Sequence, residues 1–298
     1  MTDLLWLVLR AASLVLTFQA AGAALFLFAF EHLLVASGPA IRAVALRAAV
    51  AALGVLLAQV VIEPAHLGGE LAAMTDMSLV RFVLASSAGT AFAMRIAGIS
   101  LVGLGLLWKG RQLLALAGVL LTVNSFLLTG HTTLAPHRLI LGALLFLHLG
   151  VVAFWFGALW PLRQAVHLEA PPAASELFAA FSRGAVWLVP LIPIAGVAMA
   201  VALLPNLAAL WTPYGLLLIA KALLFAVLFG IACLNRFVLT PALSGGATEV
   251  VPRLTFSLGL EFAIICATLV ITALMTGLFS PAEGASAAVT SSIVRARA

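Results

Sequence analysis

The stretch LILGALLFLHLGVVAFWFGALW, from Leu139 to Trp160, contains one histidine and no charged residue. At 1.5 Å per residue, a helix of this length extends across the ~30 Å hydrocarbon core of a bilayer. Because that core holds no water, a spanning segment must satisfy its own backbone hydrogen bonds, and a helix does so. The stretch is therefore predicted to be a transmembrane helix.

Other apolar runs of similar length make the whole chain a predicted all-α integral membrane protein, a bundle of about eight transmembrane helices. The segment Met77–Ser87 is too short to span, and Arg81 makes it too polar, so we expect it at the membrane interface. One helical-bundle domain is expected over residues 1–280, followed by an Ala- and Ser-rich disordered tail over residues 281–298. The remaining predicted spans are Leu4–Phe30, Val44–Ile62, Thr90–Trp108, Leu113–Gly130, Ala185–Leu204, Tyr214–Leu234 and Leu254–Phe279.

The composition excludes a soluble protein. Hydrophobic residues make up 64% of the chain and charged residues only 8%, against roughly 25% charged residues in soluble domains. The net charge of +5 comes from single Lys and Arg residues at the predicted helix ends, so no nucleic-acid partner is expected. Cys233 and Cys266 lie inside apolar runs, which argues against a disulfide framework.

The distribution of positive residues predicts that both termini face the periplasm. With eight spans the termini share a side, and cytoplasmic loops carry an excess of Lys and Arg. The side of the termini has four such residues, which are Arg81, Arg138, Arg295 and Arg297. The opposite side has eight, which are Arg42, Arg47, Lys109, Arg111, Arg163, Arg183, Arg236 and Arg253.

Two predicted outer loops contain residues that bind copper in other proteins. The first, EPAHLGGELAAMTDM, contains His66, Met74 and Met77, and the second, GHTTLAPHR, contains His131 and His137. Thioether sulfur favours Cu(I), and imidazole accepts either oxidation state of copper. Simple solvation of a polar loop is the alternative for both segments.

His148 is a second kind of candidate, because it lies about nine residues inside the predicted fifth span. An ionisable side chain at that depth is costly and points to function, although a neutral imidazole bonded between helices is the alternative. Asn124 lies seven residues before His131, on the same predicted helix face. We expect Asn124, His131 and His148 to form a polar column that leads inward.

Four charged residues also lie inside predicted spans. Lys221 and Glu261 are expected to support the site, although their predicted depths do not favour a direct pair. Arg10 and Arg95 are expected to have structural roles, as ion pairs or as side chains that reach toward the interface.

Several segments resemble the copper resistance protein D family. They are HLGVVAFWFGALWPL from His148, the pair Gly130-His131, FSRGAVW from Phe181, YGLLLIAKALLF from Tyr214, LNRFVLTPAL from Leu234, and the run from Arg253 to Pro281 that carries Glu261. The resemblance is strongest over residues 120–281, and the segment FAMR from Phe92 also fits.

This resemblance implies a bacterial inner-membrane protein that moves copper from the periplasm to the cytoplasm. It also implies a partner, a periplasmic copper-binding protein of the copper resistance C type, here as a separate chain. His131 and His148 match histidine positions of the family, whereas His66, Met74 and Met77 are supported by metal chemistry alone.

The sequence therefore predicts a copper transporter rather than an enzyme, with Cu(I) or Cu(II) as its cargo. The chain contains no ATP-binding motif, so a gradient or hand-off from a partner would drive transport. Two alternatives stay open. One is a b-type haem membrane oxidoreductase with His131 and His148 as axial ligands, and the other is a non-transporting membrane anchor or sensor for a periplasmic copper protein.

Overall fold

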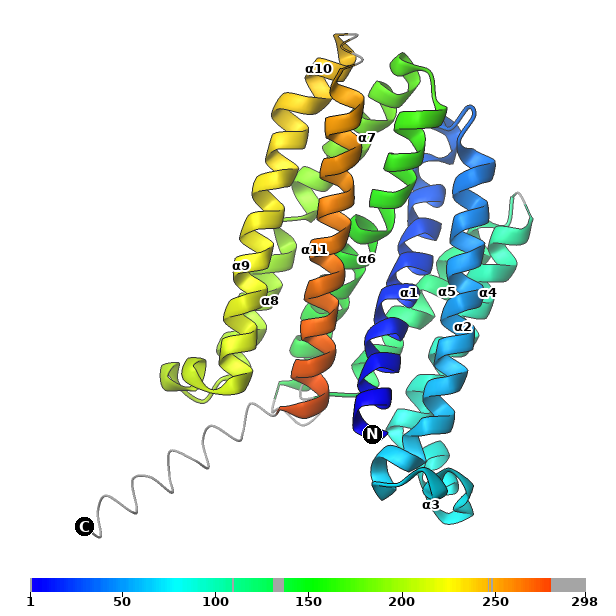
Figure 1. Cartoon of the computed structure of the whole chain (residues 1–298), viewed down its shortest axis with the longest axis vertical. Helices are drawn as coiled ribbons and strands as arrows, with labels where there is room; N and C mark the ends of the chain where they lie inside the picture. The colour runs from blue at the N-terminus through cyan, green and yellow to red at the C-terminus, as the bar shows by residue number, and fades with distance from the viewer. Residues whose placement is uncertain (1, 109, 131–136, 246, 248, 280–298) are drawn as a thin grey trace.

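The computed structural model describes residues 2–108, 110–130, 137–245, 247 and 249–279. Within these ranges the regular elements are helices, and long helices run side by side along the molecule (Figure 1). The helices are α1 (Thr2–Phe30), α2 (Gly38–Gly68), α3 (Met77–Ala85), α4 (Ser87–Leu107), α5 (Gln112–Ser125), α6 (Arg138–Leu168), α7 (Pro171–Leu188), α8 (Leu191–Leu203), α9 (Pro213–Leu234), α10 (Thr240–Ser244) and α11 (Val250–Leu278).

The all-α membrane bundle predicted from the sequence is confirmed. Seven helical stretches of the described residues are long and apolar enough to cross a membrane, and Gln112–Leu128 is a shorter apolar one. The chain is therefore a multi-pass membrane protein. The nine-residue α3 is a short helix, as expected for a segment that does not span. The expected tail, residues 281–298, lies outside the described residues.

Several predicted boundaries were wrong. The span predicted over Leu113–Gly130 is only α5 followed by a 3-10 turn at Phe126–Leu128. The span predicted over Ala185–Leu204 begins earlier, at Pro171, and consists of α7 and α8 joined at Val189 and Pro190. Proline removes a backbone donor and its ring clashes with the preceding turn, and Pro190 accounts for the break between α7 and α8.

Helix α1 occupies the centre of the bundle and contacts α2, α4, α5, α6 and α11. Helix α1 approaches α6 closely at Gly22 and Gly157. A Cβ atom built on Gly22 would lie 1.9 Å from the carbonyl oxygen of Ala153, and one built on Gly157 would lie 2.1 Å from the Gly22 backbone. Membrane helices associate through small residues of this kind, because lipid supplies no hydrophobic force between them.

The two ends of the bundle differ in how their polar groups are used. One end of the bundle, which we call the N-terminal end, contains the start of α1, the end of α2, the start of α6 and the end of α11 (Figure 1). At the other end, the Glu169 end, the α6–α7 loop meets the α1–α2 loop. There the Glu169 carboxylate accepts hydrogen bonds from the backbone N–H groups of Val35, Ala36 and Ser37 and from the Ser37 hydroxyl, at 2.6–3.1 Å.

Candidate metal site

His66 lies in the last turn of α2, and the prediction that placed it in a loop was wrong. The helix continues through Pro64 and ends only at Gly69, whose positive φ of 77° is a conformation that glycine adopts without strain. The His66 ring is stacked on the Trp6 ring with centroids 4.1 Å apart, and its Nδ1 lies 2.8 Å from Asp3 Oδ1. The position of His66 is thus fixed by α1.

The contact with Asp3 determines which nitrogen of His66 is available to bind a metal ion. An ionised carboxylate can only accept a hydrogen bond, so Nδ1 carries the hydrogen and neutral His66 keeps its lone pair on Nε2. Histidines that bind metal usually donate their other N–H to a carboxylate or a carbonyl in this way, which orients the ring and increases its basicity. The His66 side chain is 24% exposed, so solvent reaches the ring that carries Nε2.

Polar residues of three helices surround this histidine. The Trp6 indole N–H donates to Glu63 Oε2 at 2.7 Å, and the Arg10 guanidinium lies 5.1 Å from the centre of the Trp6 ring. Arg10 in turn donates to the Thr276 hydroxyl of α11 at 3.0 Å. The expected structural role of Arg10 is consistent with these contacts, which connect α1 to α11.

The two candidate methionines occupy different environments. Met74, in a 3-10 turn at Leu71–Thr75, is half-buried and packs against a small core of Trp6, Ile62 and Ala65. Met77 begins α3 and is 65% exposed. Beside it, hydrogen bonds from Ser78 hold the pKa of Asp76 below its ordinary value. Met74 is therefore the methionine that shares the Trp6 neighbourhood with His66.

The structure does not describe the whole of the predicted outer site. His131 lies outside the described residues, and His137, just before α6, is exposed. Among the residues that the structure describes, no three His, Cys, Asp or Glu side chains are placed to hold a metal ion together. His66 and Met74 are the predicted ligands that the described residues place beside Trp6.

His148 is oriented in the same way as His66. It lies ten residues into α6, about 15 Å from the start of the helix at 1.5 Å per residue. Its Nδ1 lies 3.0 Å from the Ile192 carbonyl oxygen. A carbonyl accepts but cannot donate, so Nδ1 carries the hydrogen and the lone pair is on Nε2. Lys221 of α9 is close enough to act on His148 electrostatically.

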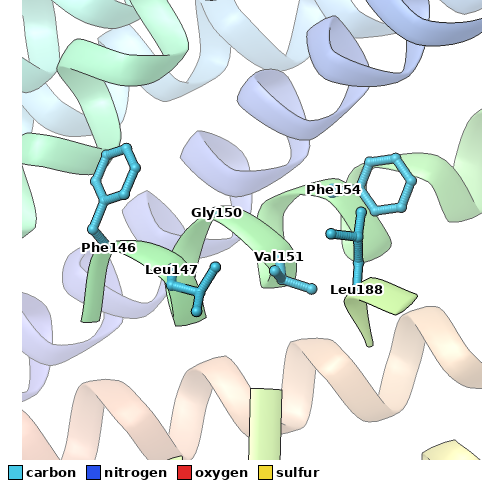
Figure 2. A pocket seen from close by; sticks show the side chains of 6 residues that line it. All are labelled: Phe146, Leu147, Gly150, Val151, Phe154 and Leu188. Carbon is cyan, nitrogen blue, oxygen red and sulfur yellow. The ribbon is translucent and has the colours of Figure 1, made fainter. Parts of the chain in front are cut away.

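The surroundings of His148 are mostly apolar. A pocket on the same stretch of α6 is lined by side chains on both sides of His148 along the helix (Figure 2). Its lining residues, which offer no side-chain ligand for a metal, are Phe146, Leu147, Gly150, Val151, Phe154 and Leu188. His148 is therefore a single polar group in an apolar stretch of helix.

The predicted polar column through Asn124 is not supported by the position of that residue. Asn124 lies near the end of α5, is exposed on the bundle surface, and donates its amide to the Leu120 carbonyl at 3.0 Å. The prediction assumed an unbroken helix from Asn124 to His131, but α5 ends at Ser125. Nearby, Arg95 is buried, donates to Ser125 Oγ at 3.0 Å and lies 4.0 Å from the Phe126 ring.

A second polar cluster, which the sequence alone did not reveal, surrounds Glu261. The Glu261 side chain is 2% exposed and accepts from Trp155 Nε1 at 3.2 Å and from Asn235 Nδ2. Asn235 begins a π-helical turn, η6 (Asn235–Leu239), a feature that often marks functional sites. We call Trp155, Asn235 and Glu261 the Glu261 group.

The Glu261 group was missed because its members are far apart in the sequence. Asn235 was noted only within the segment LNRFVLTPAL, and Trp155 only as one aromatic residue of an apolar span. The hydrogen-bond partners of Glu261 are Trp155 and Asn235, and Lys221 is not among them.

Comparison with known proteins supports a connection to copper. Residues 175–275 match the family model of copper resistance protein D. The match covers about a third of the chain and confirms, over these residues, the resemblance seen in the sequence. Lys221, Asn235 and Glu261 lie inside the matched segment, whereas His66 and His148 lie before it. No curated protein and no solved structure matches the chain.

Proposed function

We propose that this chain moves copper ions across the bacterial inner membrane, from the periplasm to the cytoplasm. Copper is received at the N-terminal end by His66, with Met74 beside it, and then passes inward through His148. His131 and His137 extend the receiving site on the basis of the sequence alone. The copper resistance protein D match over residues 175–275 supports the copper connection of this membrane protein.

One observation carries the proposal. In both His66 and His148, Nδ1 is bonded to an oxygen that can only accept, which leaves the Nε2 lone pair for a metal. The two imidazoles lie at different depths, one at the end of α2 and one ten residues into α6. Few and weak ligands at each step allow an ion to leave as well as to enter.

The orientation and the partner complete the proposal. The positive-inside rule directs the N-terminal end to the periplasm, because the sequence predicts eight Lys and Arg residues on the opposite side against four. A separate periplasmic copper-binding protein of the copper resistance C type would deliver the ion there. Reporter fusions after Ala65 and after Arg111 test this orientation. Periplasmic activity after Ala65 and cytoplasmic activity after Arg111 are expected, and the reverse result would contradict the proposal.

Copper uptake into proteoliposomes tests the role of His148. His148→Gln keeps a polar side chain that can bond to Ile192, but an amide binds copper far more weakly than an imidazole does. We expect normal insertion and abundance, copper still bound at the N-terminal end, and strongly reduced uptake. His167→Gln, at the Glu169 end, is the matched control, because His167 is exposed and bonded only to Thr255. Uptake by His148→Gln equal to that of the parent would refute this role.

An optical absorption spectrum of the purified protein distinguishes the haem alternative from copper transport. A b-type haem held by two imidazoles has a strong Soret absorption band, and a chain that only carries copper has none. Purified protein is therefore expected to bind copper without a Soret band. A non-transporting anchor or sensor would bind copper equally well but give no uptake in proteoliposomes.

A further inference from the structure

The Glu261 carboxylate lacks a counter-charge. Its oxygens accept from Trp155 and Asn235, which are both neutral donors. In the described part of the chain, Arg42 forms an ion pair with Glu31, and His66 forms one with Asp3 only when its ring is protonated; neither pair involves Glu261. A buried carboxylate without a cation is costly to keep ionised. Ionisable residues in this situation inside a membrane often bind and release protons.

The two partners differ in what they can do when Glu261 takes up a proton. An indole N–H only donates, so Glu261 Oε2 must accept from Trp155 whether or not the carboxyl group is protonated. A side-chain amide can donate through Nδ2 or accept through Oδ1. Asn235 now donates, and its Oδ1 is buried without a hydrogen-bond partner. Rotation of this amide would present Oδ1 to a proton on Glu261 Oε1.

We propose that Glu261 binds a proton at Oε1, that Asn235 changes from donor to acceptor as it does so, and that this proton enters together with copper. The coupling to copper rests on the proposed function, whereas the proton site does not. In the ionised state Nδ2–H of Asn235 donates to Oε1. In the protonated state the Oε1–H bond donates to Asn235 Oδ1, and the π-helical turn at Asn235 holds the amide beside the carboxyl group in both states.

Polar side chains on α11 extend from Glu261 toward both ends. Toward the N-terminal end, Thr268, Thr272 and Thr276 follow one another at intervals of four residues, and Thr276 accepts from Arg10. Four residues make about one helical turn, so the three hydroxyls share a face. Two turns, ~10 Å, separate Thr268 from Glu261. Toward the Glu169 end, Ser257 lies one turn from Glu261, and its Oγ is buried without a partner.

Other ionisable groups on the elements packed around Glu261 do not bond to it. Arg163 of α6 lies beside Gly259, where a Cβ atom would be 3.4 Å from its Nη1, and Arg236 donates to Ser182 of α7. Arg10 is bonded to Thr276, two turns beyond Thr268. The remaining ionisable groups of these elements are Asp3 on α1, Arg138, His148 and His167 on α6, Tyr214, Lys221 and Cys233 on α9, and Arg253 and Cys266 on α11.

Infrared difference spectroscopy of the full chain in lipid tests the proton site without copper. Acidification is expected to produce a carbonyl band from each carboxyl group that takes up a proton, and the component that belongs to Glu261, the carboxylic acid band, should be missing from the spectrum of Glu261→Gln. The glutamine variant resembles the protonated state, because its amide can accept from Trp155 and donate to Asn235 Oδ1, so it is expected to fold. Glu249→Gln, at an exposed position, should keep the band. Identical acid-induced difference spectra of Glu261→Gln and the parent would overturn the proton site.

Asn235→Leu provides a second measurement that does not change the carboxyl group. Leucine has a similar volume but can neither donate nor accept a hydrogen bond. We expect the carboxylic acid band to persist with a shifted frequency, because the proton on Oε1 has lost its acceptor. An unshifted band would overturn the role of Asn235.

Copper uptake into proteoliposomes tests the coupling. An acidic outer solution is expected to stimulate uptake by the parent, and Glu261→Gln should lose that stimulation. Equal stimulation of both proteins would overturn the coupling. If the parent takes up no copper while the infrared band depends on Glu261, the proposed function fails and the proton site stands.

Discussion

The two ends of the bundle use polar residues in opposite ways. At the Glu169 end, one carboxylate collects the N–H groups of three consecutive residues and a hydroxyl, and it joins two loops. At the N-terminal end, Asp3 bonds to Nδ1 of His66, and the hydrogen bonds of the described residues do not use the other ring nitrogen. The comparison shows that a candidate metal site is best recognised by the ring nitrogen that the hydrogen bonds leave available to a metal ion.

Removing the Glu169 carboxylate should have the largest effect of any change at either end. In Glu169→Ala, the backbone N–H groups of Val35, Ala36 and buried Ser37 lose their acceptor. Hydrogen bonds to charged groups contribute ~1.5–3 kcal/mol each and are not additive, so we expect a loss of at least ~2 kcal/mol. Thermal unfolding in detergent measures the loss, and Glu176→Gln, at an exposed position, should have no effect.

Lowering the pH should destabilise the protein as Glu169→Ala does. Burial alone would raise the pKa of Glu169, but hydrogen bonds from Ser37, Ala36 and Val35 outweigh it and hold the pKa below the ordinary value of 4.5. A carboxyl group with a lowered pKa stabilises the folded state fully above its unfolded value. This contribution is lost as the pH falls through the lowered pKa. The parent should therefore lose stability in acid below 4.5, and Glu169→Ala should lose less.

His66→Ala should show the reverse pattern, a large effect on copper and a small one on stability. Loss of the Nε2 ligand is expected to weaken copper binding at the N-terminal end by more than ~100-fold, since changes to the groups around a ligand already cost 10–100-fold. Isothermal titration with copper measures this affinity. Met77→Ala is the control, because Met77 is 65% exposed. Equal losses in the two variants would indicate that no specific site exists there.

Asp3→Ala should have the smallest effect of the three substitutions. It leaves the ligand in place but removes the acceptor that orients the His66 ring, so a loss of ~10–100-fold in copper affinity is expected. Asp3→Asn keeps an acceptor oxygen without the charge and should lie between Asp3→Ala and the parent. If Asp3→Ala binds copper as the parent does, the Asp3 contact is only structural.

The sequence predicted the spans well because the cost of placing polar groups in lipid is local to each segment. The prediction of helix ends failed where a tertiary contact lowers the cost of placing a polar residue in a helix. The end of α2 was read as a loop because Glu63, Pro64 and His66 are polar or break helices, but Trp6 and Asp3 bond to Glu63 and His66. Likewise, α7 was missed because its polar residues are balanced by an apolar face that packs in the core.

The site was predicted by residue type but not by geometry. His66 and His148 were both recognised as candidates, yet which nitrogen is available depends on Asp3 and Ile192, and no sequence pattern indicates these pairings. Asn124 was misplaced because hydropathy does not show where α5 ends. The Glu261 group needs three helices to meet, so only its charged member was visible in the sequence.

The stacking of Trp6 on His66 has an optical consequence. With the ring centroids 4.1 Å apart, a paramagnetic Cu(II) ion on Nε2 would sit within quenching distance of an indole, whereas a closed-shell Cu(I) ion would quench it much less. Trp6 fluorescence would then report which oxidation state occupies the N-terminal end. A Trp6→Phe variant, which keeps an aromatic ring, would remove that part of the signal.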